Sequence, residues 1–253
     1  MLKKLTLALT AASAVSVSSL AGAETVQSPI GELDVSMNAT LASDYIFRGI
    51  SQTQGDPAIQ GGLDVSHESG LYVGMWASNV DFGGEASSEF DFYVGYAGNI
   101  SEELSYNLGW IKYEYPGDGD EDLNFSEYYA SLSAHGFTVG TAYSNDFPGF
   151  GKNGRSDSTL YTYVGYEYSL PYDIGLALQY GNYDFKDPAF TDKNGKTSDS
   201  YNNWSIGLSK NWAGLDFGLT YTDTNLSSSE CKDFIGKSNY CDANFVVSVS
   251  KTL

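Results

Sequence analysis

The chain has 253 residues, of which 13 are Lys or Arg and 32 are Asp or Glu, so its formal net charge is −19 at pH 7. This acidity argues against nucleic acid as a partner, because phosphates are bound by basic patches. No segment reaches the roughly 18 to 20 continuous apolar residues that a transmembrane helix needs, so membrane-spanning helices are not expected.

Residues 1–23 have the features of a secretory signal peptide. Lys3 and Lys4 precede an apolar stretch rich in small residues, which ends in the A-x-A-type sequence AGA at 21–23. We therefore expect a cleaved signal peptide over 1–23 and one exported β-barrel domain over 24–253. Removing two lysines and no acids changes the net charge from −19 to −21, which favours cationic solutes or ions as partners.

The rest of the chain repeats runs of about ten residues in which apolar side chains alternate with small or polar ones. In one run, Leu215, Phe217, Leu219 and Tyr221 alternate with Asp216, Gly218, Thr220 and Thr222. The alternation predicts twelve strands, at 33–50, 58–68, 71–82, 89–100, 104–115, 125–134, 137–145, 158–170, 174–185, 201–211, 215–225 and 244–253. Each strand has one apolar face and one small or polar face.

The connectors between these strands alternate between short and long. Short turns lie at 69–70, 99–103, 135–136, 171–173 and 211–214, and longer polar connectors at 51–57, 83–88, 116–124, 146–157, 186–200 and 226–243. The pattern predicts an all-β fold, a transmembrane antiparallel up-and-down β-barrel of about 12 strands with short periplasmic turns and longer extracellular loops. The alternative is a secreted soluble β-sandwich, which also alternates but has no reason to segregate loop lengths.

The inward face of the barrel carries the candidate functional residues. If Leu33 and Leu41 face outward, alternation places Asp34, Asp44 and Arg48 inward. The same rule, applied strand by strand, gives one inward base and nine inward acids, namely Asp34, Asp44, Asp64, Glu68, Glu89, Asp91, Glu127, Glu167 and Asp216. We take as pore-lining candidates Asp44, Arg48, Asp64, Glu68, Asp91, Glu127 and Glu167. Rings of carboxylates predict a cation-favouring lumen.

Two alternatives to this lumen remain open. The acids could sit at the rims or form salt bridges and hydrogen bonds that fill the barrel, and a slip of one residue in register would reverse each face. Arg48 could define a constriction or bind an anionic group of a solute. It could also be the counter-charge for Asp44, Asp64 or Asp91.

Aromatic residues are abundant on both faces of the predicted strands. The inward set is expected to narrow the interior, so the pore is small or plugged; it comprises Tyr72, Trp76, Tyr93, Tyr129, Tyr161 and Tyr163. Outward aromatics near strand ends are expected to form the two interfacial girdles of a membrane barrel. At the long-loop side this outward set includes Tyr45 and Phe47.

Several runs resemble the TorF family of proteobacterial porin-type proteins. They are 43–53 (SDYIFRGISQT), 56–64 (DPAIQGGLD), 70–80 (GLYVGMWASNV) and 93–96 (YVGY), together with a Cys-containing loop before the closing strand. The resemblance covers most of the exported domain, and the first run is specific. It implies an outer-membrane barrel with a porin function, and it supplies no catalytic motif.

The two cysteines, Cys231 and Cys241, both fall in the last long connector. In an exported chain with no other thiol, they are expected to form a disulfide that pins the loop. Two Cys alone are too few ligands for a metal site.

An enzymatic barrel and a structural or adhesive barrel are the competing functions. Of the two histidines, His67 precedes the short turn at 69–70 and His135 lies in the short turn at 135–136, so both are expected at the periplasmic rim, and there is no G-x-S-x-G elbow or paired-His metal motif. We expect a passive, narrow pore for small solutes in the cell outer membrane, with no cofactor and no enzymatic activity. The expected partners are outer-membrane lipid, lipopolysaccharide, small solutes or ions, and the barrel-assembly machinery.

Overall fold

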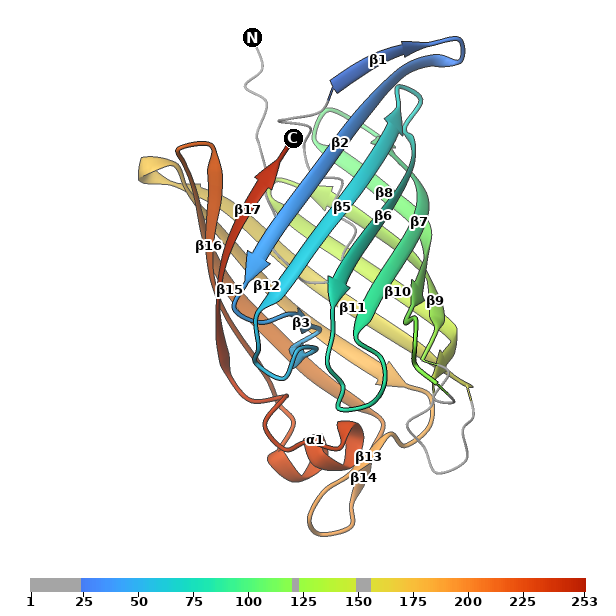
Figure 1. Cartoon of the computed structure of the whole chain (residues 1–253), viewed down its shortest axis with the longest axis vertical. Helices are drawn as coiled ribbons and strands as arrows, with labels where there is room; N and C mark the ends of the chain where they lie inside the picture. Colours follow the sequence, from blue (N-terminus) through green and yellow to red (C-terminus); the bar gives the residue numbers. More distant parts are fainter. Residues whose placement is uncertain (1–23, 120–122, 149–155) are drawn as a thin grey trace.

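The computed structural model of the protein describes residues 24–119, 123–148 and 156–253, and the expected signal peptide lies outside them. The described residues form one antiparallel β-barrel (Figure 1). Its wall strands, in chain order, are β2 (Gly31–Ala42), β5 (Ala58–His67), β6 (Leu71–Asn79), β7 (Ser88–Asn99), β8 (Leu104–Glu114), β9 (Phe125–Ala134), β10 (Phe137–Pro148), β11 (Ser156–Leu170), β12 (Ile174–Phe185), β15 (Ser200–Trp212), β16 (Leu215–Thr224) and β17 (Asn244–Thr252).

The barrel closes between its first and last wall strands. β17 pairs with β2 from Ser248 opposite Ala42 to Thr252 opposite Asn38. The sheet contains 13 strands. One of them, β1 (Glu24–Ser28), pairs only with the start of β2, beyond the part of β2 that pairs with β17. Twelve strands therefore form the wall. The predicted all-β fold with twelve antiparallel strands is therefore confirmed.

The two ends of the barrel differ. At the short-turn end, tight connections join successive strands, one of them through the single-turn 3-10 helix η1 (Pro171–Asp173), and β1 lies at this end (Figure 1). The long-loop end carries the small elements β3 (Ile46–Phe47), β4 (Ile50–Ser51), β13 (Phe190–Thr191), β14 (Thr197–Ser198) and α1 (Ser228–Ile235). Helix α1 and the β13–β14 hairpin project together at that end (Figure 1).

Alternation along each strand separates an apolar exterior from a polar interior. On β2, for example, Met37 and Leu41 are 51% and 56% exposed, whereas Ser36, which precedes Met37 and faces inward, is buried. A closed barrel with an exposed apolar band is the arrangement that satisfies both lipid and the backbone hydrogen bonds of the strands. No helix in the described part of the chain has the length and apolar character needed to cross a membrane.

The largest departure from the predicted strands is at the first long connector. The strand expected over 33–50 ends at Ala42, and the chain then turns into the barrel. Ser43 stabilises this exit, because its backbone N–H donates to the Val247 carbonyl at 2.9 Å and its hydroxyl accepts from the Val247 N–H at 3.0 Å. Tyr45 and Phe47 therefore lie inside the barrel, and their expected place in an outward girdle was wrong.

Candidate functional site

The candidate site is built around the inner hairpin, which we define as residues 43–57. Its short strands pair Ile46 with Ser51 and Phe47 with Ile50. The reversal between them uses left-handed backbone at Arg48 (φ 49°) and Gly49 (φ 85°). The left-handed conformation costs a non-glycine residue about 1–2 kcal/mol, so contacts of the Arg48 side chain must hold it in place.

Asp44 anchors the base of the inner hairpin. Its carboxylate accepts hydrogen bonds from the Ser51 hydroxyl at 2.7 Å and the Thr53 hydroxyl at 2.8 Å. The amide of Asn244, on β17, donates to its other oxygen at 2.6 Å. Burial raises the pKa of Asp44, and the hydrogen bonds from Ser51 and Thr53 partly offset that rise. The structure thus places Asp44 at a fixed junction between the hairpin and the wall.

Arg48, at the tip of the inner hairpin, pairs with Glu127 on β9. Its Nη2 lies 2.7 Å from Oε2 of Glu127, and the two side chains are 0% and 1% exposed. The Tyr113 hydroxyl, on β8, donates to the same carboxylate oxygen at 3.1 Å. The counter-charge of Arg48 is therefore Glu127, which is not among the three partners considered from sequence.

Aromatic rings surround the guanidinium of Arg48. Its Cζ lies 4.7 Å from the ring centre of Phe47, 4.3 Å from that of Tyr161 and 4.4 Å from that of Tyr183, all within cation–π range. The Tyr201 hydroxyl donates to the Arg48 carbonyl at 3.1 Å. Sequence reasoning does not single out Tyr183 and Tyr201, although their alternation with neighbouring outward residues places both inside.

The other side of the inner hairpin contacts the opposite part of the wall. The Tyr45 hydroxyl donates to Glu89, on β7, at 2.7 Å, and its ring packs edge-on against Trp76, on β6, with centroids 5.3 Å apart. Phe47 packs edge-on against Tyr113 at 5.9 Å. Arg48 of the same hairpin contacts residues of β9, β11 and β12. The hairpin therefore reaches across the interior from one side of the wall to the other.

The last long loop, which connects β16 to β17, contacts the inner hairpin at the long-loop end of the barrel. The Ser51 N–H donates to the Tyr240 carbonyl at 2.9 Å, and Tyr240 precedes Cys241, which forms the predicted disulfide with Cys231. In α1 of the same loop, Phe234 packs against Phe185 of β12 with centroids 5.1 Å apart. The disulfide and α1 thus fix the loop segment against which the hairpin rests.

Toward the short-turn end, tyrosines line one side of the interior. The Tyr93 hydroxyl donates to Asp64 at 2.6 Å, and the Tyr72 hydroxyl lies 2.6 Å from that of Tyr129. These residues come from β5, β6, β7 and β9. The strands opposite, β15 and β16, present small inward side chains, namely Ser205, Gly207, Ser209, Gly218 and Thr220.

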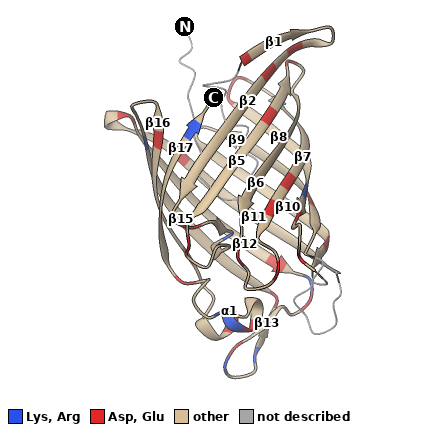
Figure 2. Ribbon diagram, in the orientation of Figure 1, with Lys and Arg blue, Asp and Glu red and all other residues tan. Residues whose placement is uncertain are grey.

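Of the remaining acidic candidates, Asp91 interacts electrostatically with Glu89 and Glu127, whereas Glu68 and Glu167 lie toward the short-turn end. Asp91 is buried on β7, Glu167 is half-buried on β11 near the short-turn end, and Glu68 is exposed in the turn between β5 and β6. Figure 2 shows acidic positions along the wall and few basic ones. Within residues 24–119, 123–148 and 156–253, no group of three or more His, Cys, Asp or Glu side chains could hold a metal ion.

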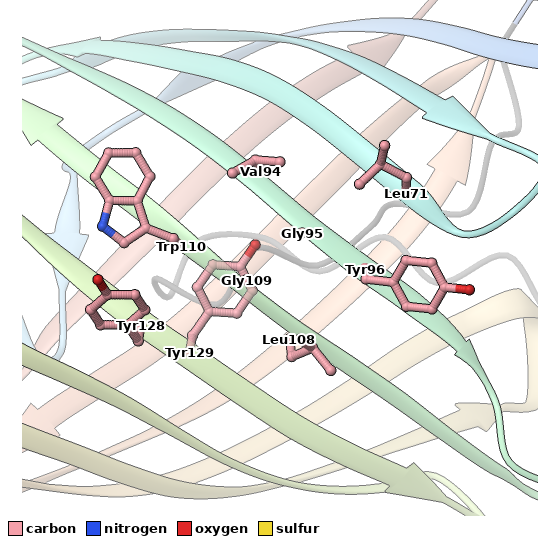
Figure 3. A pocket seen from close by; sticks show the side chains of 9 residues that line it. All are labelled: Leu71, Val94, Gly95, Tyr96, Leu108, Gly109, Trp110, Tyr128 and Tyr129. Atoms are coloured by element: carbon pink, nitrogen blue, oxygen red, sulfur yellow. The ribbon is translucent and has the colours of Figure 1, made fainter. Parts of the chain in front are cut away.

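The outer wall carries an apolar depression of about 460 Å³ over β6 to β9 (Figure 3). Most of its side chains belong to the outward, lipid-type face; the lining residues are Leu71, Val94, Gly95, Tyr96, Leu108, Gly109, Trp110, Tyr128 and Tyr129. The only inward side chain in this set is that of Tyr129, whose ring lies against Gly109 on the inner side of the wall. The depression therefore belongs to the exterior surface and not to the lumen.

The two histidines lie far from the inner hairpin, at the short-turn end. His67 ends β5, and its Nδ1 is 2.7 Å from the Ser69 hydroxyl. His135 lies in the turn between β9 and β10, with Nε2 3.3 Å from a carboxylate oxygen of Glu103. Within the described residues, neither histidine forms a hydrogen bond with the acids and tyrosines around Arg48.

Comparison with known proteins identifies a matching protein family and several solved structures of similar fold. The bacterial family described as "Bacterial protein of unknown function (Gcw_chp)" matches residues 26–253. No curated protein sequence matches the chain. The structure of the KdgM porin is similar with 11% identity and a TM-score of 0.50, over 85% of this chain and 98% of that one. The NanC porin has 13% identity and a TM-score of 0.51, over 86% of this chain and 98% of that one. These likenesses show a shared barrel fold.

Proposed function

The chain belongs to the Gcw_chp family of bacterial proteins, and we propose that it is an outer-membrane porin: a passive, narrow, cation-favouring channel for small solutes. The observation that carries the proposal is a closed twelve-stranded barrel whose interior holds acids at several levels and a hairpin across one end. The porin-type fold of KdgM and NanC supports it, as does the resemblance of several runs to the TorF family.

The proposed location follows from the exterior. Its exposed apolar side chains need lipid, and bacterial barrels place short turns in the periplasm and long loops outside. The inner hairpin, α1 and the disulfide then face the cell exterior, and both ends of the described chain lie on the periplasmic side. A signal peptide over 1–23, the barrel-assembly machinery and lipopolysaccharide contacts belong to this proposal.

The proposed ion preference follows from uncompensated charge. Arg48 is paired with Glu127, so it does not offset the other inward acids. Asp64 and Glu167 are partly exposed inside the barrel, where their charges act on ions that enter. In a narrow, low-dielectric passage such carboxylates lower the energy of cations and raise that of anions.

The inner hairpin is the proposed constriction. It carries the first of the runs that resemble the TorF family, and its tip is buried against β9, β11 and β12. The same burial favours a second candidate, a structural or adhesive barrel whose interior is filled and which transports nothing. An enzyme is not proposed, because the two histidines lie at the opposite end of the barrel from the inner hairpin.

The experiment that separates the two candidates is a planar-bilayer recording on refolded protein starting at Glu24. A porin gives discrete current steps, and a hairpin-shortened variant, in which residues 46–51 are replaced by a Gly-Ser linker, gives larger ones. A filled barrel gives no steps from wild-type protein that is shown to be folded by its heat-modifiable electrophoretic mobility. Steps of equal size in both proteins would rule out the hairpin as the constriction.

A further inference from the structure

We infer that Glu127, Tyr161 and Tyr183 form a binding site in the barrel wall for organic cations that carry a guanidinium or alkylammonium group, and that Arg48 is its tethered occupant. We call these three residues the wall cage. The inference identifies organic cations as the solute class of the proposed channel, and it rests on the proposed function, since solutes must enter the barrel to reach the wall cage. Its charge and ring geometry match the chemistry of cation recognition.

The wall cage has two aromatic faces and one carboxylate. The rings of Tyr161 and Tyr183 are nearly perpendicular, at 82°, with centroids 5.8 Å apart, so they form a corner. The Arg48 guanidinium sits in this corner, with Cζ 4.3 and 4.4 Å from the two ring centres. Glu127 closes the corner with an oxygen 2.7 Å from Nη2. Two ring faces and an anion are the usual elements of an organic-cation site.

Contacts that do not involve the inner hairpin hold the wall cage in shape. The Tyr161 hydroxyl donates to Asn203 at 3.1 Å and accepts from the Gln179 amide at 3.0 Å. The Tyr183 ring packs against Phe185 at 4.5 Å, and the Tyr113 hydroxyl donates to Glu127 at 3.1 Å. These partners lie on β8, β12 and β15. We therefore expect the wall cage to keep its form in a protein that lacks the Arg48 side chain.

The fit of Arg48 to the wall cage is incomplete. Within the described residues, its Nε and Nη1 and the Glu127 Oε1 are buried without hydrogen-bond partners. A guanidinium and a carboxylate can form two parallel hydrogen bonds, whereas this pair forms one through Nη2 and Oε2. The left-handed backbone at Arg48 and Gly49 explains the restriction, since the hairpin fixes the angle at which the side chain arrives. A free guanidinium ion is not restricted in this way.

The site distinguishes classes of solute. An anion meets the Glu127 carboxylate and is repelled. A small inorganic cation must give up tightly held water to contact ring faces, whereas a guanidinium is weakly hydrated and stacks on them. Phe47, the third ring around Arg48, belongs to the inner hairpin and leaves with it.

The test is isothermal titration calorimetry of folded protein in detergent, with methylguanidinium chloride as the probe and NaCl at equal ionic strength as the reference. In Arg48→Ala the wall cage is free, and binding of methylguanidinium but not of sodium is expected. In Arg48→Ala/Glu127→Gln the affinity should fall about 10- to 100-fold, the loss expected for a charged hydrogen-bond partner. The matched control is Arg48→Ala/Glu114→Gln, because Glu114 faces outward on β8, and its affinity should stay at the Arg48→Ala value.

No binding to folded Arg48→Ala, or equal binding in the Glu127→Gln and Glu114→Gln pairs, would overturn the inference. If Arg48→Ala does not fold, the hairpin-shortened variant exposes the same wall cage, and the Glu127→Gln and Glu114→Gln changes are made in it instead. Calorimetry does not depend on conduction. Binding without current in the bilayer therefore contradicts the proposed channel and leaves the wall cage standing, and current without binding does the reverse.

Discussion

The Arg48 guanidinium and the Glu127 carboxylate, 79 positions apart in the chain, form a buried ion pair across the barrel interior with a 2.7 Å separation. Arg48 belongs to the first long connector and Glu127 to β9, so the pair ties a loop to a distant wall strand. Removing two charges from water is costly, and such a pair is retained only with good contacts around it. Here the contacts are the aromatic rings and the Tyr113 hydroxyl.

Glu127→Gln is expected to destabilise the barrel by about 3–5 kcal/mol, because it leaves the Arg48 charge buried without a carboxylate. Urea unfolding in detergent, followed by tyrosine and tryptophan fluorescence, measures the loss. Glu114→Gln removes the partner of Lys112 from an exposed ion pair and should cost less than about 1 kcal/mol. Equal losses of unfolding free energy in the two variants would show that the Arg48–Glu127 pair stabilises the barrel no more than the Lys112–Glu114 pair does.

Asp64→Asn is expected to reduce cation preference, because it removes a carboxylate that is partly exposed inside the barrel. The reversal potential in a KCl gradient should move toward zero relative to wild type. Glu114→Gln, on the outer face, should leave it unchanged. An unaltered reversal potential in Asp64→Asn would mean that passing ions do not sense this charge.

Cys231→Ser/Cys241→Ser is expected to loosen the last loop and leave the barrel intact. The disulfide joins two residues with a sequence separation of 10. By the chain-entropy model it stabilises the closed form of the loop by up to about 3 kcal/mol. The pairing of the wall strands does not depend on it. Trypsin cleavage at exposed Lys237 should become faster, while the urea midpoint stays within error. A lower midpoint would show that the loop supports the whole barrel.

Asp44 gives the stability a pH dependence. Burial raises its pKa in the folded protein, so above about pH 4, where the unfolded carboxyl loses its proton, the folded state binds more protons than the unfolded state. The unfolding free energy attributable to Asp44 therefore falls as pH rises from about 4 through the raised pKa of the folded state. Asp44→Asn does not titrate, so its urea stability should change less over this range. Parallel curves for the two proteins would refute the role of Asp44.

The wall of the barrel is predictable from sequence because its rules are local. Side chains alternate every two residues, and connectors alternate in length, so strands such as β9 at Phe125–Ala134 and β12 at Ile174–Phe185 have the predicted bounds. Helix α1 also has a local signal that the alternation analysis passes over. Ser227 and Glu230 form a capping box, and Gly236 ends the helix in left-handed backbone.

The inner hairpin is not predictable in this way because distant residues determine it. Residues 43–50 continue the alternation of β2 and therefore suggest a longer strand. The contacts that draw them inward come from Asn244 to Asp44, 200 positions along the chain, and from Glu127 to Arg48. No local pattern reports such pairings. The pore-lining role of the seven candidate residues stays a prediction, although Arg48 and Glu127 are in direct contact.

A cation-favouring channel is tested most directly by the reversal potential of single channels of refolded wild-type protein in a planar bilayer with a KCl gradient. We expect discrete steps and a reversal potential of the sign set by K⁺, because the Arg48 charge is neutralised by Glu127 and the charges of inward acids such as Asp64 are not. Folded protein that gives no steps, or steps with a reversal potential set by Cl⁻, would contradict it.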